Sequence, residues 1–167
     1  MNSRHPSPLR ILSAGGTFEK SYDPIKGSLG FSSSHLNQIC TQARLQDDVN
    51  IEVVMLIDSL DMNEGHRAQI MRACLLAPES RLVIVHGTDT MVETAQALSR
   101  ENMGKTIVLT GAMVPFQVAA SDALFNLGFA MAAARLQPTG VYIAMNAQLF
   151  EWSAVRKNRS LGRFEAL

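Results

Sequence analysis

Cysteine is scarce in this sequence of 167 residues, since only Cys40 and Cys74 occur. No Cys-x-x-Cys or Cys/His pairing accompanies them, and each lies in an expected helix among apolar neighbours. Two isolated cysteines do not make the dense framework of a small secreted protein. We therefore interpret both as buried, reduced thiols of a cytoplasmic protein. We expect neither a metal site nor a bound cofactor.

An excess of charge of one sign is also missing. The chain has 15 Lys+Arg and 15 Asp+Glu residues, so its formal net charge is +0. A nucleic acid or an anionic membrane surface normally requires a basic face, and we expect neither as a partner. No apolar run approaches the roughly 20 residues of a membrane span. The apolar run after the polar, Pro-broken segment 1–8 is too short for a signal-peptide core.

Strand-like and helix-like segments alternate along nearly the whole chain. Short apolar runs predict strands at residues 10–14, 50–56, 82–85, 106–109 and 141–145. Capping residues and helical spacing predict helices from the 32–34 serines to about 44, at 64–76, after 88–90 and from Ser121 or Asp122 to about 135. Segment 18–31 has no periodicity and predicts a functional loop. The pattern indicates one α/β domain, a three-layer Rossmann-like open parallel sheet with helices on both faces.

The apolar spacing also predicts which side chains of two helices face the core. In the first helix we expect Leu36, Ile39 and Cys40 to point inward. In helix 64–76 we expect the apolar stripe to be Ile70, Met71 and Leu75.

Four of the expected strands end in glycine or serine with hydroxyl or carboxylate side chains. These turns are Gly15-Gly16-Thr17, Ser59 with Asp61, Gly87-Thr88-Asp89 and Thr110-Gly111-Ala112. The carboxyl ends of parallel strands meet at one edge of the sheet, where open α/β folds bind ligands. Glycine permits close approach, and the following helix termini supply N–H groups for a carboxylate. The sequence therefore predicts a polar site at this edge. Each turn taken alone also fits a purely structural role, because glycine and threonine are common where strands end.

Taken together, these turns resemble the successive motifs of the bacterial-type L-asparaginase/glutaminase family. The resemblance runs from about residue 10 to residue 157. It rests on Gly15-Gly16-Thr17, Asp58-Ser59-Leu60-Asp61-Met62-Asn63, His86-Gly87-Thr88-Asp89-Thr90-Met91, Thr110-Gly111-Ala112-Met113 with Pro115, and Phe125-Asn126-Leu127. The motifs occur in family order, and the string that begins at His86 is highly specific.

This resemblance implies hydrolysis of L-asparagine to L-aspartate and ammonia by a threonine nucleophile. It implies that Thr17 attacks the side-chain amide carbon and forms an acyl-enzyme, and that Thr88 belongs to a Thr-Lys-Asp constellation with Lys157 and Asp89. For substrate binding it implies Asp89 for the α-ammonium group. It assigns the α-carboxylate to Ser59 with the amide of Leu60, and the scissile amide to the carbonyl of Ala112. Gly16 belongs to the same pocket through its backbone.

Two catalytic assignments have rivals among neighbouring residues. The family has a tyrosine in the mobile loop after its first threonine, which favours Tyr22 here, with Glu19 and Lys20 as alternatives. Lys157 is placed by counting from Asn146 without a gap, and the alternative is a solvated tail residue. Arg156 is adjacent, but neighbouring side chains on an extended segment point to opposite sides. We interpret His66 and His86 as structural residues, because no metal-ligand set surrounds either.

The chain departs from the family pattern in length and at Leu60. Typical members are about twice as long and have a smaller carboxy-terminal domain, so the resemblance implies a short form in which residues 1–167 are the amino-terminal domain and the second domain is absent. Glu19 is a candidate to replace groups of that domain. Leu60 replaces a polar residue, often glutamine, and predicts weak or no glutaminase activity. Apolar helix surface left bare favours a homo-oligomer, a dimer or tetramer.

Two other functions remain open at this point. The chain could be a non-catalytic amino-acid-binding or regulatory subunit that retains the pocket. It could also be an amidase for another small amide, acting alone or in a transamidation complex. If the chain is an asparaginase, as the resemblance implies, its small-molecule partner is L-asparagine.

Overall fold

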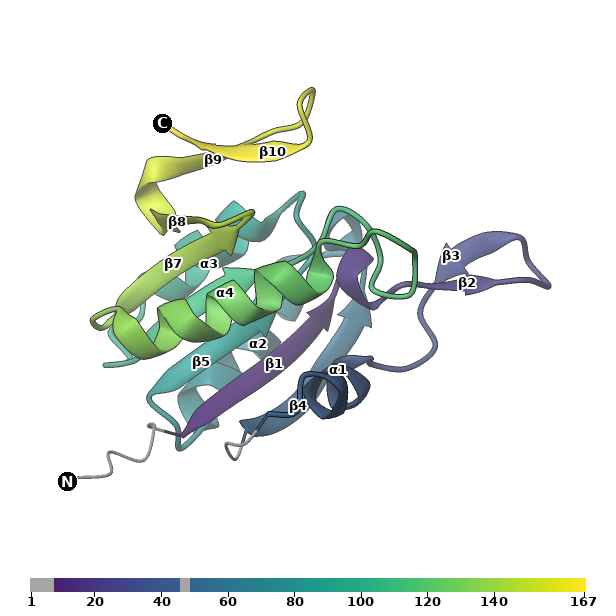
Figure 1. Cartoon of the computed structure of the whole chain (residues 1–167). Helices are drawn as coiled ribbons and strands as arrows, with labels where there is room; N and C mark the ends of the chain where they lie inside the picture. The colour runs from purple at the N-terminus through teal and green to yellow at the C-terminus, as the bar shows by residue number, and fades with distance from the viewer. Residues whose placement is uncertain (1–7, 46–48) are drawn as a thin grey trace.

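The carboxyl ends of five parallel strands point the same way in a six-stranded mixed sheet (Figure 1). The computed structural model describes residues 8–45 and 49–167, and within these ranges the strand order is β4-β1-β5-β6-β7-β8. The strands are β1 (Leu9–Gly15), β4 (Val49–Ile57), β5 (Arg81–Val85), β6 (Thr106–Thr110), β7 (Gly140–Met145) and β8 (Gln148–Glu151). β8 pairs antiparallel with β7. The predicted α/β sheet is confirmed, with this one antiparallel addition.

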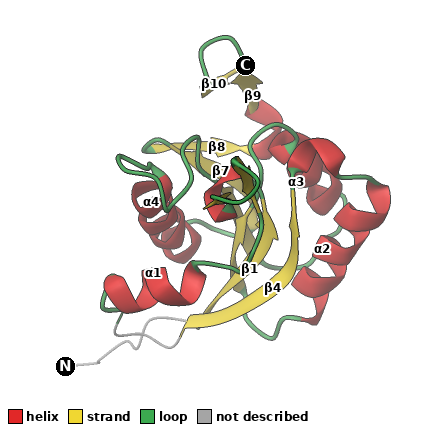
Figure 2. Cartoon of the chain, turned by 90° about the vertical axis from the view of Figure 1, so that its right-hand side faces the viewer, coloured by secondary structure: helices red, strands yellow, loops and turns green. Residues whose placement is uncertain are grey.

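Helices cover both faces of the sheet (Figure 2). α1 (Leu36–Gln42) and α4 (Ala123–Leu136) lie on one side, and α2 (Glu64–Leu76) and α3 (Met91–Ser99) lie on the other. The apolar run of β5 alternates between them: Val83 and Val85 belong to the first core, and Leu82 and Ile84 to the second. A strand buried on both faces needs this continuous apolar run. Among the described residues, no helix is long and apolar enough to cross a membrane.

Two helix predictions are wrong in detail. The first helix begins at Leu36 rather than at the serines 32–34, although Ser34 Oγ accepts a hydrogen bond from Leu36 N. In α2, Leu75 is 52% exposed, whereas Ile70 and Cys74 are fully buried. Cys74 takes the inward position because it follows Ile70 by four residues, one helical turn. Both cysteines are free, Cys40 only partly buried, and burial raises the pKa of the Cys74 thiol to about 12.

Two hairpins lie outside the sequence prediction. Within the expected loop 18–31, β2 (Ser21–Asp23) pairs with β3 (Ser28–Gly30). After β8, β9 (Val155–Asn158) pairs with β10 (Arg163–Ala166). Figure 1 shows that both hairpins project from the main sheet. Strands of three or four residues are too short to show a clear alternation of apolar and polar residues, so the sequence does not predict them.

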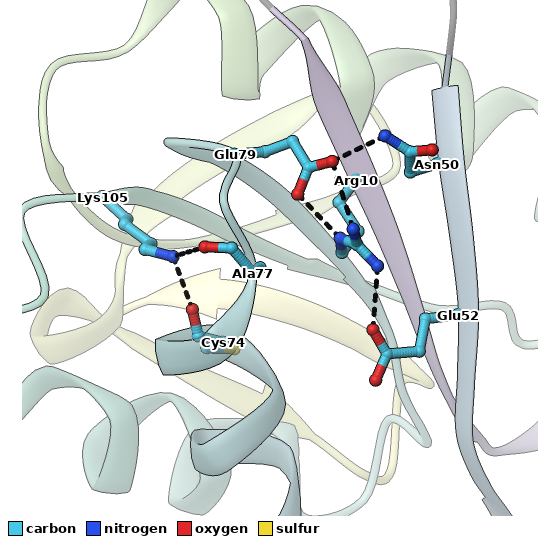
Figure 3. A network of polar contacts seen from close by, with 7 residues as sticks. All are labelled: Arg10, Asn50, Glu52, Cys74, Ala77, Glu79 and Lys105. Atoms are coloured by element: carbon cyan, nitrogen blue, oxygen red, sulfur yellow. Dashed lines mark hydrogen bonds and ion pairs between the residues drawn. The ribbon is translucent and has the colours of Figure 1, made fainter.

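An ion-pair network lies at the opposite edge of the sheet, where the strands begin (Figure 3). Arg10 Nε donates to Glu79 Oε2 at 2.7 Å, and Arg10 Nη1 donates to Glu52 Oε2 at 2.9 Å. Asn50 Nδ2 also donates to Glu79, at 2.6 Å. The hydrogen bond from Arg10 is the main cause that lowers the pKa of Glu79. The network therefore joins β1, β4 and the segment before β5.

Lys105 completes this edge by capping α2. Its Nζ donates to the carbonyl of Cys74 at 2.7 Å and also to that of Ala77. The last carbonyls of a helix have no intrahelical partner and carry a partial negative charge, so an ammonium group stabilises them.

Glu79→Ala is expected to lower the free energy of unfolding by about 3 kcal/mol, because it leaves Arg10 without its buried partner. Glu52→Ala is the matched control. The Glu52 side chain is 42% exposed, against 4% for Glu79, and its loss is expected to cost less than about 1 kcal/mol. Urea unfolding of both variants measures the difference, and equal losses would contradict this division.

Candidate active site

Glycine backbones bring the four predicted turns into contact. A Cβ on Gly16 would collide with the backbone of Gly87, and a Cβ on Gly87 would collide with the side chain of Ser59. A Cβ on Gly111 would meet the carbonyl of His86 and lie 3.3 Å from the Thr88 methyl carbon. The first, second and fourth turns therefore all touch the third. The shared edge expected from the sequence is present in the structure.

The pairing of β1 with β4 becomes irregular just before Thr17. The β1–β4 register shifts between Ser13 and Gly15, and Gly16 N donates to Ile57 O at 2.9 Å. Gly16 has φ 76° and ψ −179°, a backbone conformation that essentially only glycine adopts. The chain then turns into a 3₁₀ segment, Thr17–Glu19, in which Thr17 is partly buried.

Thr88, Lys157 and Asp89 form a connected set. Lys157 Nζ donates to Thr88 Oγ1 at 2.7 Å and lies 2.8 Å from Asp89 Oδ1. Only 11% of the Lys157 side chain is exposed, so it is not the solvated tail residue that the sequence left as the alternative. Lys157 comes from β9, and the fold carries it across nearly seventy residues of sequence to the third turn.

The second turn holds Ser59 and Leu60 in different environments. Ser59 is 1% exposed, and its Oγ has no hydrogen-bond partner among the described residues. The Leu60 side chain is 64% exposed, and the Leu60 N–H already donates to Asp58 Oδ1 at 3.1 Å. A substrate carboxylate would have to share that N–H. Asp58 also pairs with Lys20 at 2.5 Å, and this hydrogen bond is the main cause that lowers the pKa of Asp58.

Asp122 and Asn126 hold the fourth turn, which contains Ala112. The Asp122 carboxylate accepts hydrogen bonds from the N–H groups of Met113 and Val114, both at 3.0 Å. Asn126 Nδ2 donates to Gly111 O at 3.0 Å. Ala112 is thus fixed on both sides by side chains from the start of α4. The sequence contained Asn126 in a family motif but indicated no role for it.

Tyr22 and Glu19 do not join the group. Tyr22 is 62% exposed on the projecting β2–β3 hairpin (Figure 1). Its catalytic role therefore stays a prediction that requires the hairpin to move. Glu19 is fully buried, and its carboxylate accepts from Ser13 Oγ at 2.6 Å and from His35 N at 2.8 Å. Glu19 is wrong as a candidate for the substrate ammonium, because these bonds use it to anchor the loop.

The two histidines considered in the sequence have structural contacts. His86 is fully buried, its Nδ1 lies 2.7 Å from Gly87 O, and its Nε2 lies 2.9 Å from Thr94 Oγ1. A carbonyl only accepts, so Nδ1 carries the proton and Nε2 accepts from Thr94. His66 completes a capping box with Asn63 at the start of α2. No group of three or more His, Cys, Asp or Glu side chains in the described ranges could hold a metal ion.

The fold and the site define a class of protein. It is an open α/β domain in which the Thr88 hydroxyl, the Lys157 amine and the Asp89 carboxylate meet where the parallel strands end. The family model described as "Asparaginase, N-terminal" matches residues 8–166. The solved structure of the thermostable L-asparaginase from Thermococcus kodakarensis superposes with a TM-score of 0.85 at 30% identity, covering 96% of this chain and 51% of that one. The chain therefore belongs to the asparaginase family.

Individual relatives differ in function and are longer than this chain. The L-asparaginase of T. kodakarensis is 32% identical over 160 residues, which cover 92% of this chain and 48% of that protein. A subunit of the glutamyl-tRNA(Gln) amidotransferase of Methanococcus maripaludis is also 32% identical, covering 93% and 40%. The structure of a probable cytoplasmic L-asparaginase from Campylobacter jejuni gives a TM-score of 0.83 at 28% identity, covering 96% and 53%. The chain spans about half the length of these relatives or less.

Gly16→Ala is expected to destabilise the protein by more than about 3 kcal/mol, because the new Cβ meets the Gly87 backbone at a strained conformation. Gly27→Ala is the control. Gly27 also has a positive φ, of 65°, but has open space around it, so its cost is expected to stay near 1 kcal/mol. If denaturant unfolding gave equal losses of stability for the two variants, the contact between Gly16 and Gly87 would not determine the cost of the substitution.

The free energy of unfolding is expected to fall as the pH drops from about 6.5 to about 4. Burial lowers the pKa of His86 to about 4 in the folded protein. Over this interval the unfolded chain takes up a proton at His86 and the folded chain does not, which costs about 3 kcal/mol. In His86→Gln this part of the pH dependence should be absent, while the carboxylates contribute equally to both proteins. Parallel pH profiles for the two proteins would contradict a buried neutral His86.

Proposed function

We propose that this domain hydrolyses L-asparagine to L-aspartate and ammonia. The observation that carries the proposal is the contact of Lys157 with both Thr88 Oγ1 and Asp89 Oδ1. A threonine hydroxyl is a poor nucleophile at neutral pH, so its use in catalysis requires a proton relay within hydrogen-bond distance. The set formed by Thr88, Lys157 and Asp89 supplies such a relay at Thr88. Gly16, which precedes Thr17, packs against Gly87, which precedes Thr88.

In the proposed reaction, the Thr17 hydroxyl oxygen bonds to the side-chain amide carbon of asparagine. The carbon–nitrogen bond breaks, and ammonia leaves with the proton that the hydroxyl gave up. Water then attacks the resulting ester, releases L-aspartate and restores the Thr17 hydroxyl. Thr88, with Lys157, is assigned to the activation of the nucleophile or of the water. Tyr22 is assigned to activate Thr17 once the β2–β3 hairpin lies over the turn.

Substrate recognition is assigned to groups of the same four turns. Asp89 binds the α-ammonium group, Ser59 with Leu60 N binds the α-carboxylate, and the Ala112 carbonyl orients the amide beside Gly16. The buried Ser59 Oγ has no partner within residues 8–45 and 49–167, which supports this assignment, because such a group usually finds a partner in a ligand or water. The exposed, apolar Leu60 side chain offers no hydrogen bond to a longer substrate, which favours weak or no glutaminase activity.

The setting of this domain is part of the proposal. We place it in the cytoplasm as a homo-oligomer, a dimer or tetramer, with L-asparagine as its small-molecule partner. The exposed apolar side chains Phe125 and Leu136 on α4, 61% and 81% exposed, support association with another surface.

A second function is supported by the relatives that are amidotransferase subunits. The similarity to the amidotransferase subunit of M. maripaludis favours an amide-hydrolysing subunit that works in a transamidation complex. A non-catalytic amino-acid-binding subunit is the third hypothesis. Ammonia release from asparagine by the chain alone separates the first function from both others, and a panel of related amides distinguishes an amidase for another substrate.

Thr17→Ala and Thr88→Val are each expected to reduce ammonia release from L-asparagine at least about a hundredfold, because they remove the nucleophile and the relay. Thr41→Ala, an exposed threonine of α1, is the matched control and should retain full activity. A coupled ammonia assay measures the rates, and thermal unfolding checks that the variants fold. Undiminished turnover in Thr17→Ala would overturn the nucleophile assignment.

A further inference from the structure

The β9–β10 hairpin places a second positively charged side chain, that of Arg159, at the predicted site. Side chains alternate along a strand, so residues two apart share a side. Arg156 and Asn158 both face Glu165, at 3.0 Å from Arg156 Nε and 3.3 Å from Asn158 Nδ2. Lys157 and Arg159 take the other side, toward Asp89. Arg159 follows the last residue of β9, in the turn before β10, and this turn also brings it toward Asp89.

Arg159 contacts Asp89 at two atoms. Its Nε lies 3.7 Å from Asp89 Oδ1, and its Nη2 donates to the Asp89 carbonyl at 3.4 Å. Oδ1 is the same oxygen that lies 2.8 Å from Lys157 Nζ. One carboxylate thus faces two positive side chains. Asp58 of the second turn pairs with Lys20, which follows the first turn, so these two neighbouring charges add no net charge.

A substrate ammonium group at Asp89 would be the third cation on one carboxylate. We propose that Arg159 is a specificity-determining positioning residue, which acts through Asp89 to weaken the site's demand for an α-ammonium group. The site would then accept monoamides of four-carbon dicarboxylic acids that lack this group, such as succinamate, and would prefer asparagine less strongly than Asp89 without Arg159 would. This inference rests on the proposed amide hydrolysis and specifies its substrate class.

The size of the effect follows from exposure. The Arg159 side chain is 65% exposed, so its interaction with Asp89 is moderate and is screened by salt. Removing it should change substrate preference by about three- to tenfold rather than by orders of magnitude.

The experiment compares kcat/KM for L-asparagine and for succinamate in the full chain. In Arg159→Ala the ratio of asparagine to succinamate should rise about three- to tenfold, and Arg159→Lys should stay near the wild-type ratio. Arg163→Ala is the matched control, because Arg163 lies on the same hairpin, is 63% exposed and pairs with Glu165. At about 1 M salt the difference between wild type and Arg159→Ala should largely vanish, a response that a purely structural role would not give.

An asparagine-to-succinamate ratio that is the same in Arg159→Ala and in Arg163→Ala would overturn the inference while leaving asparagine hydrolysis intact. If neither amide yields ammonia with any variant, the proposed function fails, and calorimetric binding of L-aspartate against succinate decides the inference instead. A rise in the preference for aspartate in Arg159→Ala alone supports it, and no rise overturns it.

Discussion

The backbone contact between Gly16 and Gly87 is the constraint on which the predicted site depends. Any side chain at Gly16 would enter the third turn, so only glycine permits the first and third turns to touch. Thr17 and Thr88 each follow one of these glycines in the chain, so the contact fixes the backbone from which each side chain starts. Since Gly87 also packs against Ser59, one pair of small residues sets the distance between three strand ends.

Charged residues at the two ends of the parallel strands have different roles. At the edge where strands begin, Arg10 and Glu79 tie neighbouring strands together through buried charge (Figure 3). At the edge where the strands end, Asp89 and Lys157 form an ion pair in which the Asp89 side chain is partly exposed to solvent.

The site is completed from outside the parallel sheet. Lys157 reaches Thr88 only because β8 reverses the chain after β7 and the β9–β10 hairpin lies beyond it. That hairpin supplies Lys157 and Arg159 from one side and keeps Arg156 on the other. Strand alternation separates Lys157 from Arg156, and the turn after β9 brings Arg159 toward Asp89. Counting along the chain pointed to Lys157, which lies beside Thr88 in the structure, whereas no pattern in the sequence singled out Arg159.

Hydrophobic period and turn chemistry were enough to determine the five parallel strands, the four helices and the polar edge, because these depend on neighbours close in sequence. Local pattern failed where partners were distant: Leu75 fits an apolar stripe but faces solvent, and Glu19 is a loop carboxylate that folds inward to Ser13 and His35. The sequence by itself determined which side chains stand at the strand ends. Only the tertiary structure decided which of them meet, because hydrogen bonds and ion pairs act over a few ångströms between residues that the chain separates widely.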